Sequence, residues 1–137
     1  MYIYSTMNIA INDSFLYPRM LNEDDIKYNY YMIMSMLPDN YRKLLHDNEL
    51  LNNFEYKVII LENINTTTIV AIISIRIGNT HSNLGKIGFI RDIILYNNYN
   101  NKKIHEYALK SALEYCKNEE DCISVIVSDS IKNRYPC

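Results

Sequence analysis

The chain has 137 residues, which is enough for one ordinary hydrophobic core and too few for two, so we expect a single domain over residues 1–137. Hydrophobic residues make up 48% of the chain and charged residues 22%, a balance that excludes a disordered or fibrous protein. The formal net charge of -2 gives no electrostatic reason to expect a nucleic acid or an anionic membrane as a partner.

The cysteines point to a reducing compartment. Cys116, Cys122 and Cys137 form neither an even disulfide framework nor a CxxC pair, so an intracellular, cytoplasmic location is expected. No charged start with an apolar run of signal-peptide length is present, and no apolar segment approaches the roughly twenty residues of a membrane span. The three histidines lack a second ligand at metal-binding spacing, so we expect no metal site.

The first half of the chain predicts a strand and two helices. Residues 15–20 predict a short strand, and residues 2–11 form an alternative segment that pairs as well. Residues 21–38 predict a helix, because Asn22 can cap it, three acidic residues fill its first turn and a proline ends it. Apolar residues recur there at spacings of three and four. The same arrangement over residues 40–51 predicts a second helix.

The second half of the chain is rich in β-branched residues. Four segments read as strands: residues 56–62, 66–77, 85–95 and 121–129. We expect the first two to be antiparallel neighbours, and a polar loop over residues 78–83 follows them. This order of elements predicts an α+β fold.

A helix over residues 102–117 is expected to connect the last two strands and to pack on the sheet through its apolar half. That half contains Ile104, Ala108, Leu109, Ala112, Leu113 and Cys116.

The sequence GFIRDIILYNNYNNKKIHEYALKSALEYCKN, residues 88–118, places a buried strand, a polar loop and an amphipathic helix in succession. It resembles the Gcn5-related N-acetyltransferase (GNAT) superfamily, nearest the glucosamine-6-phosphate N-acetyltransferase branch. The likeness covers residues 86–133. KIGFIRDIIL is similar to that branch's strand G-H-I-E-D-V-V-V, YNNYNNKKIH stands where its acetyl-CoA loop lies, and LEYCKNEEDCISVIVSDSIKN resembles its helix end, fifth strand and following Asn. FLYPRMLNEDDI agrees in outline with the family's opening strand and acidic helix start.

The resemblance implies a GNAT-like central sheet that is mixed, mostly antiparallel and flanked by helices. The chain ends in NRYPC, where the family continues through a Tyr and two more strands, so we expect the sheet to stop after its fifth or sixth strand. An open sheet edge invites association, and a homodimer or a larger protein complex is therefore expected.

The resemblance also implies an activity. The protein is expected to transfer an acetyl group from acetyl-CoA, as co-substrate, to a small amine acceptor such as an amino-sugar phosphate. In the family, a bulged and splayed central strand leaves backbone groups that hold pantetheine and polarise the thioester. The loop and the helix N-terminus bind pyrophosphate. By carry-over, Asp92 is the catalytic residue and orients the acceptor. The expected cofactor-binding residues are Ile93, Ile94, Leu95, Asn100, Asn101, Lys102, Lys103 and Ile104.

Several positions depart from the family's pattern. Its loop reads Arg or Gln, two residues, Gly, one residue, then Gly or Ala, and the matching positions here are Asn100, Lys103 and His105. Backbone approaches a pyrophosphate less closely where a Cβ and an imidazole must fit. His105 is expected to pack toward the sheet. Arg91 occupies the position of the family's Glu, and Cys137 stands at about the position of its Tyr.

These departures favour a second hypothesis, in which the chain is a catalytically inactive GNAT-derived scaffold for protein–protein interaction. In that interpretation Lys102 and Lys103 are solvated residues of a first helical turn, because cations there oppose the helix dipole. Asp92 can cap a bulge as readily as it can orient an acceptor. The sequence leaves open whether the protein is an enzyme.

Overall fold

The computed structural model describes residues 10–11, 14–80, 84–96, 99 and 101–134. Its elements in chain order are β1 (Ala10–Ile11), β2 (Ser14–Met20), α1 (Glu23–Met36), α2 (Asp39–His46), β3 (Tyr56–Asn63), β4 (Thr68–Asn79), β5 (Lys86–Leu95), α3 (Lys102–Asn118), β6 (Cys122–Val127) and α4 (Asp129–Arg134). The strands form one sheet in the order β1-β2-β3-β4-β5-β6. Strands β1 to β5 are antiparallel neighbours and β6 runs parallel to β5, so the predicted mixed, mostly antiparallel sheet is confirmed.

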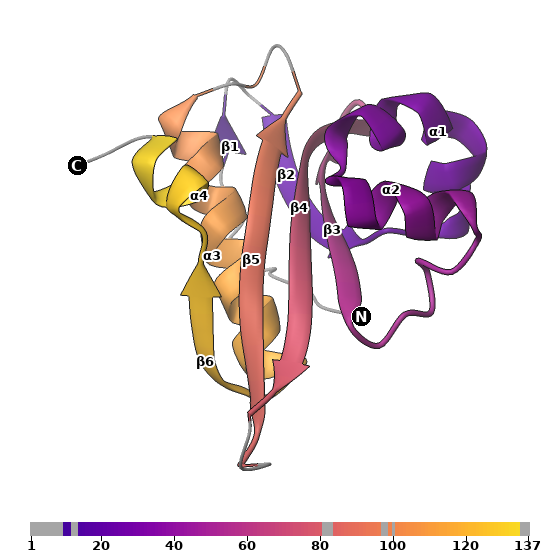
Figure 1. Ribbon diagram of the computed structural model, residues 1–137. Coiled ribbons are helices and arrows are strands. Elements are labelled where there is room, and N and C mark those ends of the chain that lie inside the picture. The colour runs from indigo at the N-terminus through magenta and orange to yellow at the C-terminus, as the bar shows by residue number, and fades with distance from the viewer. Residues whose placement is uncertain (1–9, 12–13, 81–83, 97–98, 100, 135–137) are drawn as a thin grey trace.

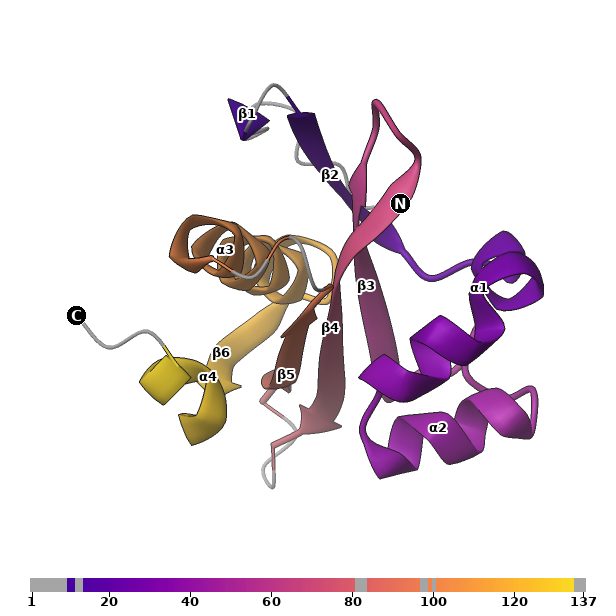
Figure 2. The same cartoon turned by 90° about the horizontal axis from the view of Figure 1, so that it is seen from above.

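The sheet separates two layers of helices, with α1 and α2 on one face and α3 on the other (Figures 1 and 2). The core on the α3 side includes Ile73, Ile75, Ile90, Ile93, Ala108 and Ala112. The core on the α1/α2 side includes Ile33, Leu37, Tyr41, Leu45, Ile60 and Ile72. Alternate residues of the central strands therefore belong to opposite cores, as the pleat of a strand requires.

The start of α1 is fixed as the sequence predicted. Asn22 accepts a hydrogen bond from the Asp25 N–H at 3.0 Å, and the Asp25 carboxylate accepts one from the Asn22 N–H at 2.9 Å, which is a capping box. Arg19 of β2 donates to both oxygens of the same carboxylate at 2.7 Å and to Glu62 of β3 at 2.5 Å. This network ties the helix to two strands. Within α1, Asn29 departs from helical geometry and kinks the helix.

The prediction of a helix to Leu51 is wrong, because α2 ends at His46. Asn48 adopts a left-handed φ of 60°, which turns the chain out of the helix. Leu50 is nevertheless buried against the α1/α2 core. Leu50 is apolar because it packs against the core after the turn. The spacing of apolar residues alone does not distinguish such a residue from one on the buried face of a helix.

The buried face of α3 is rotated from the predicted one. Leu113 is 37% exposed, whereas Ser111 and His105 are buried, so His105 packs inward as expected. Gly88 of β5 explains the close approach, because a Cβ there would lie 2.7 Å from Cys116 Sγ. The absence of a Cβ at Gly88 therefore allows the Cys116 side of α3 to pack close to the sheet.

The short helix α4 has no counterpart among the predicted elements. It follows β6 directly and buries Ile131 in the core on the α3 side. None of the described helices combines the length and the apolar character that crossing a lipid bilayer requires.

Candidate active site

Strand β5 contains a β-bulge at Arg91. Ser74 of β4 pairs with Asp92, and the next residue, Ile75, pairs with Ile90, so Arg91 has no partner across the ladder. A bulge of this kind bends the strand and increases its local twist.

Strand β6 ends beside the bulge, and β5 continues beyond it. Their parallel pairing ends at Ile90 and Val127, and residues 91–95 have no partner on β6. Figure 1 shows β6 ending near the middle of β5 while β5 continues. Ser128, which follows β6, makes the last hydrogen bonds to β5. Its N–H donates to the Ile90 carbonyl at 3.1 Å, and its Oγ donates to the Arg91 carbonyl at 3.0 Å. Beyond this point this edge of β5 has no strand partner among the described residues, which leaves a gap in the sheet next to α4.

The antiparallel pairing with β4 determines which backbone groups face this gap. The Tyr96 N–H donates to the Val70 carbonyl at 2.8 Å, so every second residue from Tyr96 turns its backbone groups toward β4. Ile94 belongs to this set. Ile93 and Leu95 turn their N–H and C=O groups toward the gap instead.

Asp92 lies at the start of the separated segment and is partly exposed. Its Oδ1 accepts a hydrogen bond from the Ile93 N–H at 2.9 Å. The carboxylate therefore caps the first amide after the bulge, which is one of the two roles considered for it.

The N-terminus of α3 follows β5 after a short loop, in which Asn100 lies outside the described residues. The Asn101 side chain accepts a hydrogen bond from the Ile104 N–H at 2.9 Å and caps the helix. The N–H groups of Lys102 and Lys103 are in the first turn, where no intrahelical partner is available. Two amides are thus left for an anion, and the third is taken by the cap.

The two lysines of this turn differ in their charge partners. Both are exposed. Lys102 Nζ lies 3.9 Å from Glu106 Oε1, whereas Lys103 forms no ion pair with a described residue. Lys103 is therefore the more available cation at the helix N-terminus.

Two buried polar side chains, one on α2 and one on β4, are not among the site residues that the sequence predicts. Tyr41 of α2 is 2% exposed and Ser74 of β4 is 1% exposed. Neither hydroxyl has a hydrogen-bond partner among the described residues. Burial, the largest cause, raises the pKa of Tyr41, and the charge of Arg91 acts in the opposite direction. These residues are far apart in sequence, and no local motif joins them.

A separate cavity of about 630 Å³ lies at the opposite end of β5, near Phe54 and Lys86. Its charged groups pair with one another: Arg76 bonds to Glu55 at 2.6 Å, and Lys86 bonds to Glu120 at 3.2 Å. No group of three His, Cys, Asp or Glu side chains among the described residues is placed to hold a metal ion. The tyrosine position of the family, Cys137 here, lies outside the described residues.

No protein-family model matches the sequence, and no curated relative does. Solved structures do. A GNAT family acetyltransferase from Staphylococcus aureus superposes with a TM-score of 0.66 at 12% identity, covering 89% of this chain and 92% of that one. Glucosamine-6-phosphate N-acetyltransferase from Arabidopsis thaliana gives a TM-score of 0.65 at 18% identity, covering 87% and 85%. The aminoglycoside N-acetyltransferase AAC(6')-Iy in complex with CoA gives 0.66 at 13% identity, covering 91% and 84%. The protein therefore has the fold of the GNAT acetyltransferases, as its sequence predicted.

Proposed function

We propose that the protein transfers an acetyl group from acetyl-CoA to a small primary amine, such as an amino-sugar phosphate. The observation that carries this proposal is the end of β6 beside the Arg91 bulge, which leaves the rest of β5 without a strand partner on one edge among the described residues. The backbone N–H and C=O of Leu95 face the gap, and the N-terminus of α3 follows in the chain. An extended pantetheine arm can bond to the open strand edge while pyrophosphate lies at the helix N-terminus.

In the proposed reaction the amine nitrogen attacks the thioester carbonyl carbon. A C–N bond forms, the C–S bond breaks and the CoA thiolate departs, while the amine loses one proton. The Leu95 N–H at the gap stabilises the negative charge that develops on the carbonyl oxygen, since the Ile93 N–H is already bonded to Asp92. Asp92 orients the amine by accepting a hydrogen bond from it, and the proton that the nitrogen loses passes to water. An alkyl thiol has a pKa of about 8.5, so the thiolate can take its proton from water without a positioned acid.

The pyrophosphate, in this proposal, is held by the amides of Lys102 and Lys103 and by the Lys103 ammonium group. The cap from Asn101 to the Ile104 amide removes one donor that a glycine-rich loop would offer. We therefore expect acetyl-CoA binding in the micromolar range, weaker than a complete loop would provide.

The test is isothermal titration calorimetry with acetyl-CoA, followed by release of free thiol with glucosamine 6-phosphate as acceptor. Binding together with acceptor-dependent thiol release supports the proposal. Absence of acetyl-CoA binding by the natural chain overturns it. If the natural chain does not bind, a Lys103→Gly, His105→Gly double variant is tested next, after thermal melting has shown that it folds. Binding by this variant would show that the natural chain has a former acetyl-CoA groove that these two side chains close.

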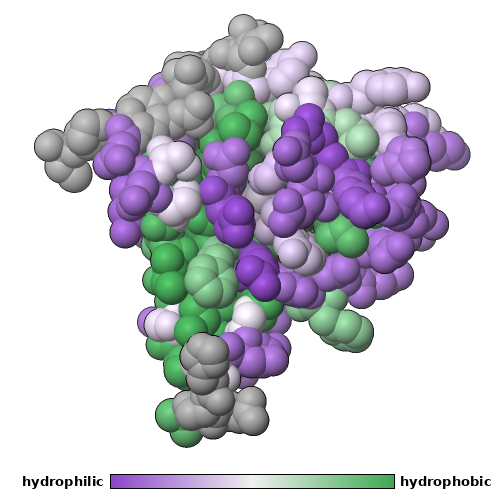
Figure 3. All heavy atoms as spheres, in the orientation of Figure 1, coloured by the Kyte–Doolittle hydropathy of each residue, from purple (hydrophilic) through white to green (hydrophobic). Residues whose placement is uncertain are grey.

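A second candidate function, the inactive interaction scaffold, is favoured by the surface of β6. Ile123 is 59% exposed and Ile126 50% exposed on the last strand of the described sheet, and Leu84 nearby is 76% exposed. Figure 3 shows apolar surface over β5 and β6, whereas α1 and α2 present a mainly hydrophilic one. An unpaired apolar edge favours association with a second copy. Size-exclusion chromatography with light scattering tests this, and a monomer at micromolar concentration would contradict it.

We also propose that the protein works in the cytoplasm, as the cysteine content predicts. Cys116 and Cys122 are free thiols. Burial raises the pKa of the Cys116 thiol to about 12, so the thiol stays protonated and unreactive near neutral pH. Localisation of a tagged chain by cell fractionation tests this placement.

A further inference from the structure

We propose that the cavity where β4 ends and β5 begins is a second ligand site, which binds a small molecule that joins an anionic group to a flat ring. Lys57 binds the anion, and the ring packs against Phe54. This cavity lies at the other end of β5 from the gap in the sheet, so the inference goes beyond the proposed function and does not depend on it.

The cavity has the size of a small-molecule site. Its volume is about 630 Å³, and small-molecule sites in proteins typically measure about 300 to 1,000 Å³. Figure 1 shows the start of β3, the end of β4, the start of β5 and the end of α3 together at the lower end of the sheet. The residues that line the cavity include Phe54, Lys57, Ile77, Asn79, Lys86 and Glu120.

The register of the sheet places two lysines of the cavity on the face that α3 covers. Lys57 pairs with Ile75, which belongs to the core on the α3 side, so Lys57 faces α3. Lys86 pairs with Asn79, which follows Ile77 of the same core by two residues and shares its face. The two lysines therefore come from different strands and lie on one side of the sheet.

A single carboxylate, that of Glu120, serves both lysines. Its Oε1 accepts a hydrogen bond from Lys86 Nζ at 3.2 Å, and its Oε2 accepts one from the Tyr115 hydroxyl at 2.5 Å. Lys57 Nζ lies 4.0 Å from the same Oε2. Each oxygen of Glu120 thus has a close donor already, and Lys57 has only a long contact with it.

Lys57 is therefore the cation with the least compensation in the cavity. Three cations, Lys57, Arg76 and Lys86, and two carboxylates, Glu55 and Glu120, are among the described residues that line it, which leaves one positive charge in excess. Arg76 is paired with Glu55 at 2.6 Å. The Lys57 side chain is only 21% exposed, so water compensates its charge incompletely. An anionic ligand supplies the missing charge.

The backbone of β4 adds a neutral donor beside this charge. The Ile77 N–H donates to the Glu55 carbonyl at 2.7 Å, so Asn79, two residues further, turns its N–H toward the same side. Strand β3 begins only at Tyr56, and the ladder between β3 and β4 does not reach Asn79. An ionised carboxylate or phosphate accepts hydrogen bonds from both an amide and an ammonium group.

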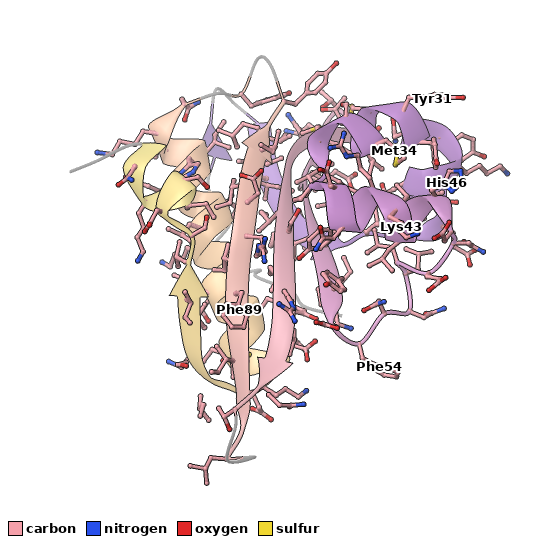
Figure 4. The ribbon with its side chains drawn as sticks, viewed as in Figure 1. Tyr31, Met34, Lys43, His46, Phe54 and Phe89 are labelled. Atoms are coloured by element: carbon pink, nitrogen blue, oxygen red, sulfur yellow. The ribbon has the colours of Figure 1, made fainter. Side chains whose placement is uncertain are left out.

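Phe54 gives the cavity an apolar wall next to the cation. Its side chain is 91% exposed, and its ring centroid lies 6.0 Å from Lys57 Nζ. Figure 4 shows Phe54 at the lower end of the molecule, away from Lys43 on α2. A flat ring that packs on Phe54 buries this apolar surface and brings an attached anion close to Lys57.

An NMR titration of the full chain, followed through its backbone amide signals, tests the inference. Phenyl phosphate is compared with phenol and with inorganic phosphate, which carry the ring alone and the anion alone. We expect phenyl phosphate to bind about tenfold more tightly than either, with shifts at Gly78, Asn79 and Lys86. Benzoate against benzyl alcohol repeats the comparison for a carboxylate, and the larger ratio identifies the preferred anion.

Two variants separate the contributions of the charge and of the ring. Lys57→Gln should weaken phenyl phosphate about tenfold, whereas Lys43→Gln, which removes an exposed charge paired with Asp47 on α2, should leave it unchanged. Phe54→Ala should weaken phenyl phosphate about three- to tenfold and leave inorganic phosphate unchanged. Because Phe54 is 91% exposed, its removal leaves the core intact.

Several outcomes would overturn the inference. They are equal affinity for phenyl phosphate and phenol, equal effects of Lys57→Gln and Lys43→Gln, and absence of binding by every probe at millimolar concentration. Shifts confined to the amides of Lys102 and Lys103 would place the anion at the N-terminus of α3 and would also contradict it. No arm of this experiment uses acetyl-CoA or an amine, so its result is independent of whether the proposed acetyl transfer occurs.

Discussion

The bulge at Arg91 divides β5 into two segments with different surroundings. Residues 86–90 pair with β4 on one side and β6 on the other, and Gly88 packs against Cys116 of α3. Residues 91–95 pair with β4 alone and leave their other edge facing a gap. The first segment packs against α3, and the second is the part of the strand in which we propose the ligand site. One continuous strand thus gives the proposed site a rigid base.

The largest expected effect comes from breaking the doubly paired segment. In Gly88→Ala, the added Cβ would lie 2.7 Å from Cys116 Sγ, too close for a normal contact, and 3.3 Å from Cys122 Sγ. We expect a loss of about 3 kcal/mol in the free energy of unfolding, measured with urea.

Gly78→Ala is the matched control for Gly88, because its nearest contact would be Phe89 Cε2 at an ordinary 3.4 Å. It should cost less than about 1 kcal/mol. Similar losses in the two variants would show that the α3 contact is not tighter than the rest of the sheet.

A smaller effect on stability, but a large one on activity, is expected from the singly paired segment. Asp92→Asn keeps an oxygen that can accept the Ile93 N–H but removes the charge proposed to orient the amine. We expect kcat to fall about 100-fold with the acetyl-CoA affinity unchanged. Asp24→Asn, at an exposed residue of α1, is the charge control. Full activity of Asp92→Asn would leave Asp92 with its capping role alone.

The pH dependence of stability gives a third comparison. Burial raises the pKa of Cys116 from 9.0 to about 12, so below pH 9 the thiol is protonated in both the folded and the unfolded chain. Above pH 9 the unfolded chain loses this proton first, and stability falls as pH rises through that window. From about pH 8 to about pH 10 we expect a loss of about 1 kcal/mol that is absent in Cys116→Ala. Parallel urea-derived curves for the two proteins would contradict this prediction.

The smallest effect concerns the helix N-terminus after the open segment. Lys103→Gln should raise the acetyl-CoA dissociation constant about three- to fivefold, because one exposed charge contact contributes on the order of 1 kcal/mol. Lys102→Gln should have a weaker effect, since Lys102 already pairs with Glu106 at 3.9 Å. Equal acetyl-CoA dissociation constants for the two variants in calorimetry would mean that Lys103 does not contact the phosphates more closely than Lys102 does.

Much of the fold was predictable because its signals are local. Asn22 caps α1 and the start of α3 at Lys102 lies where the sequence predicts it. The end of α2 was not predictable from periodicity, since Leu50 is buried without being helical. The site was predictable in part: the resemblance indicated a bulged strand, but the pairing of Ser74 with Asp92 gives the bulge its position at Arg91.

The sequence by itself determined the order of the elements from β2 to β6, the cap of α1 at Asn22 and the resemblance to the GNAT superfamily, because these depend on residues close together in the chain. The tertiary structure alone decided which face of α3 is buried, where β6 ends beside β5, and that Tyr41 packs against Tyr56. Those features depend on register and packing between segments that are distant in sequence. Gly88 is an example: its lack of a Cβ matters only once the sheet has formed and α3 packs against it.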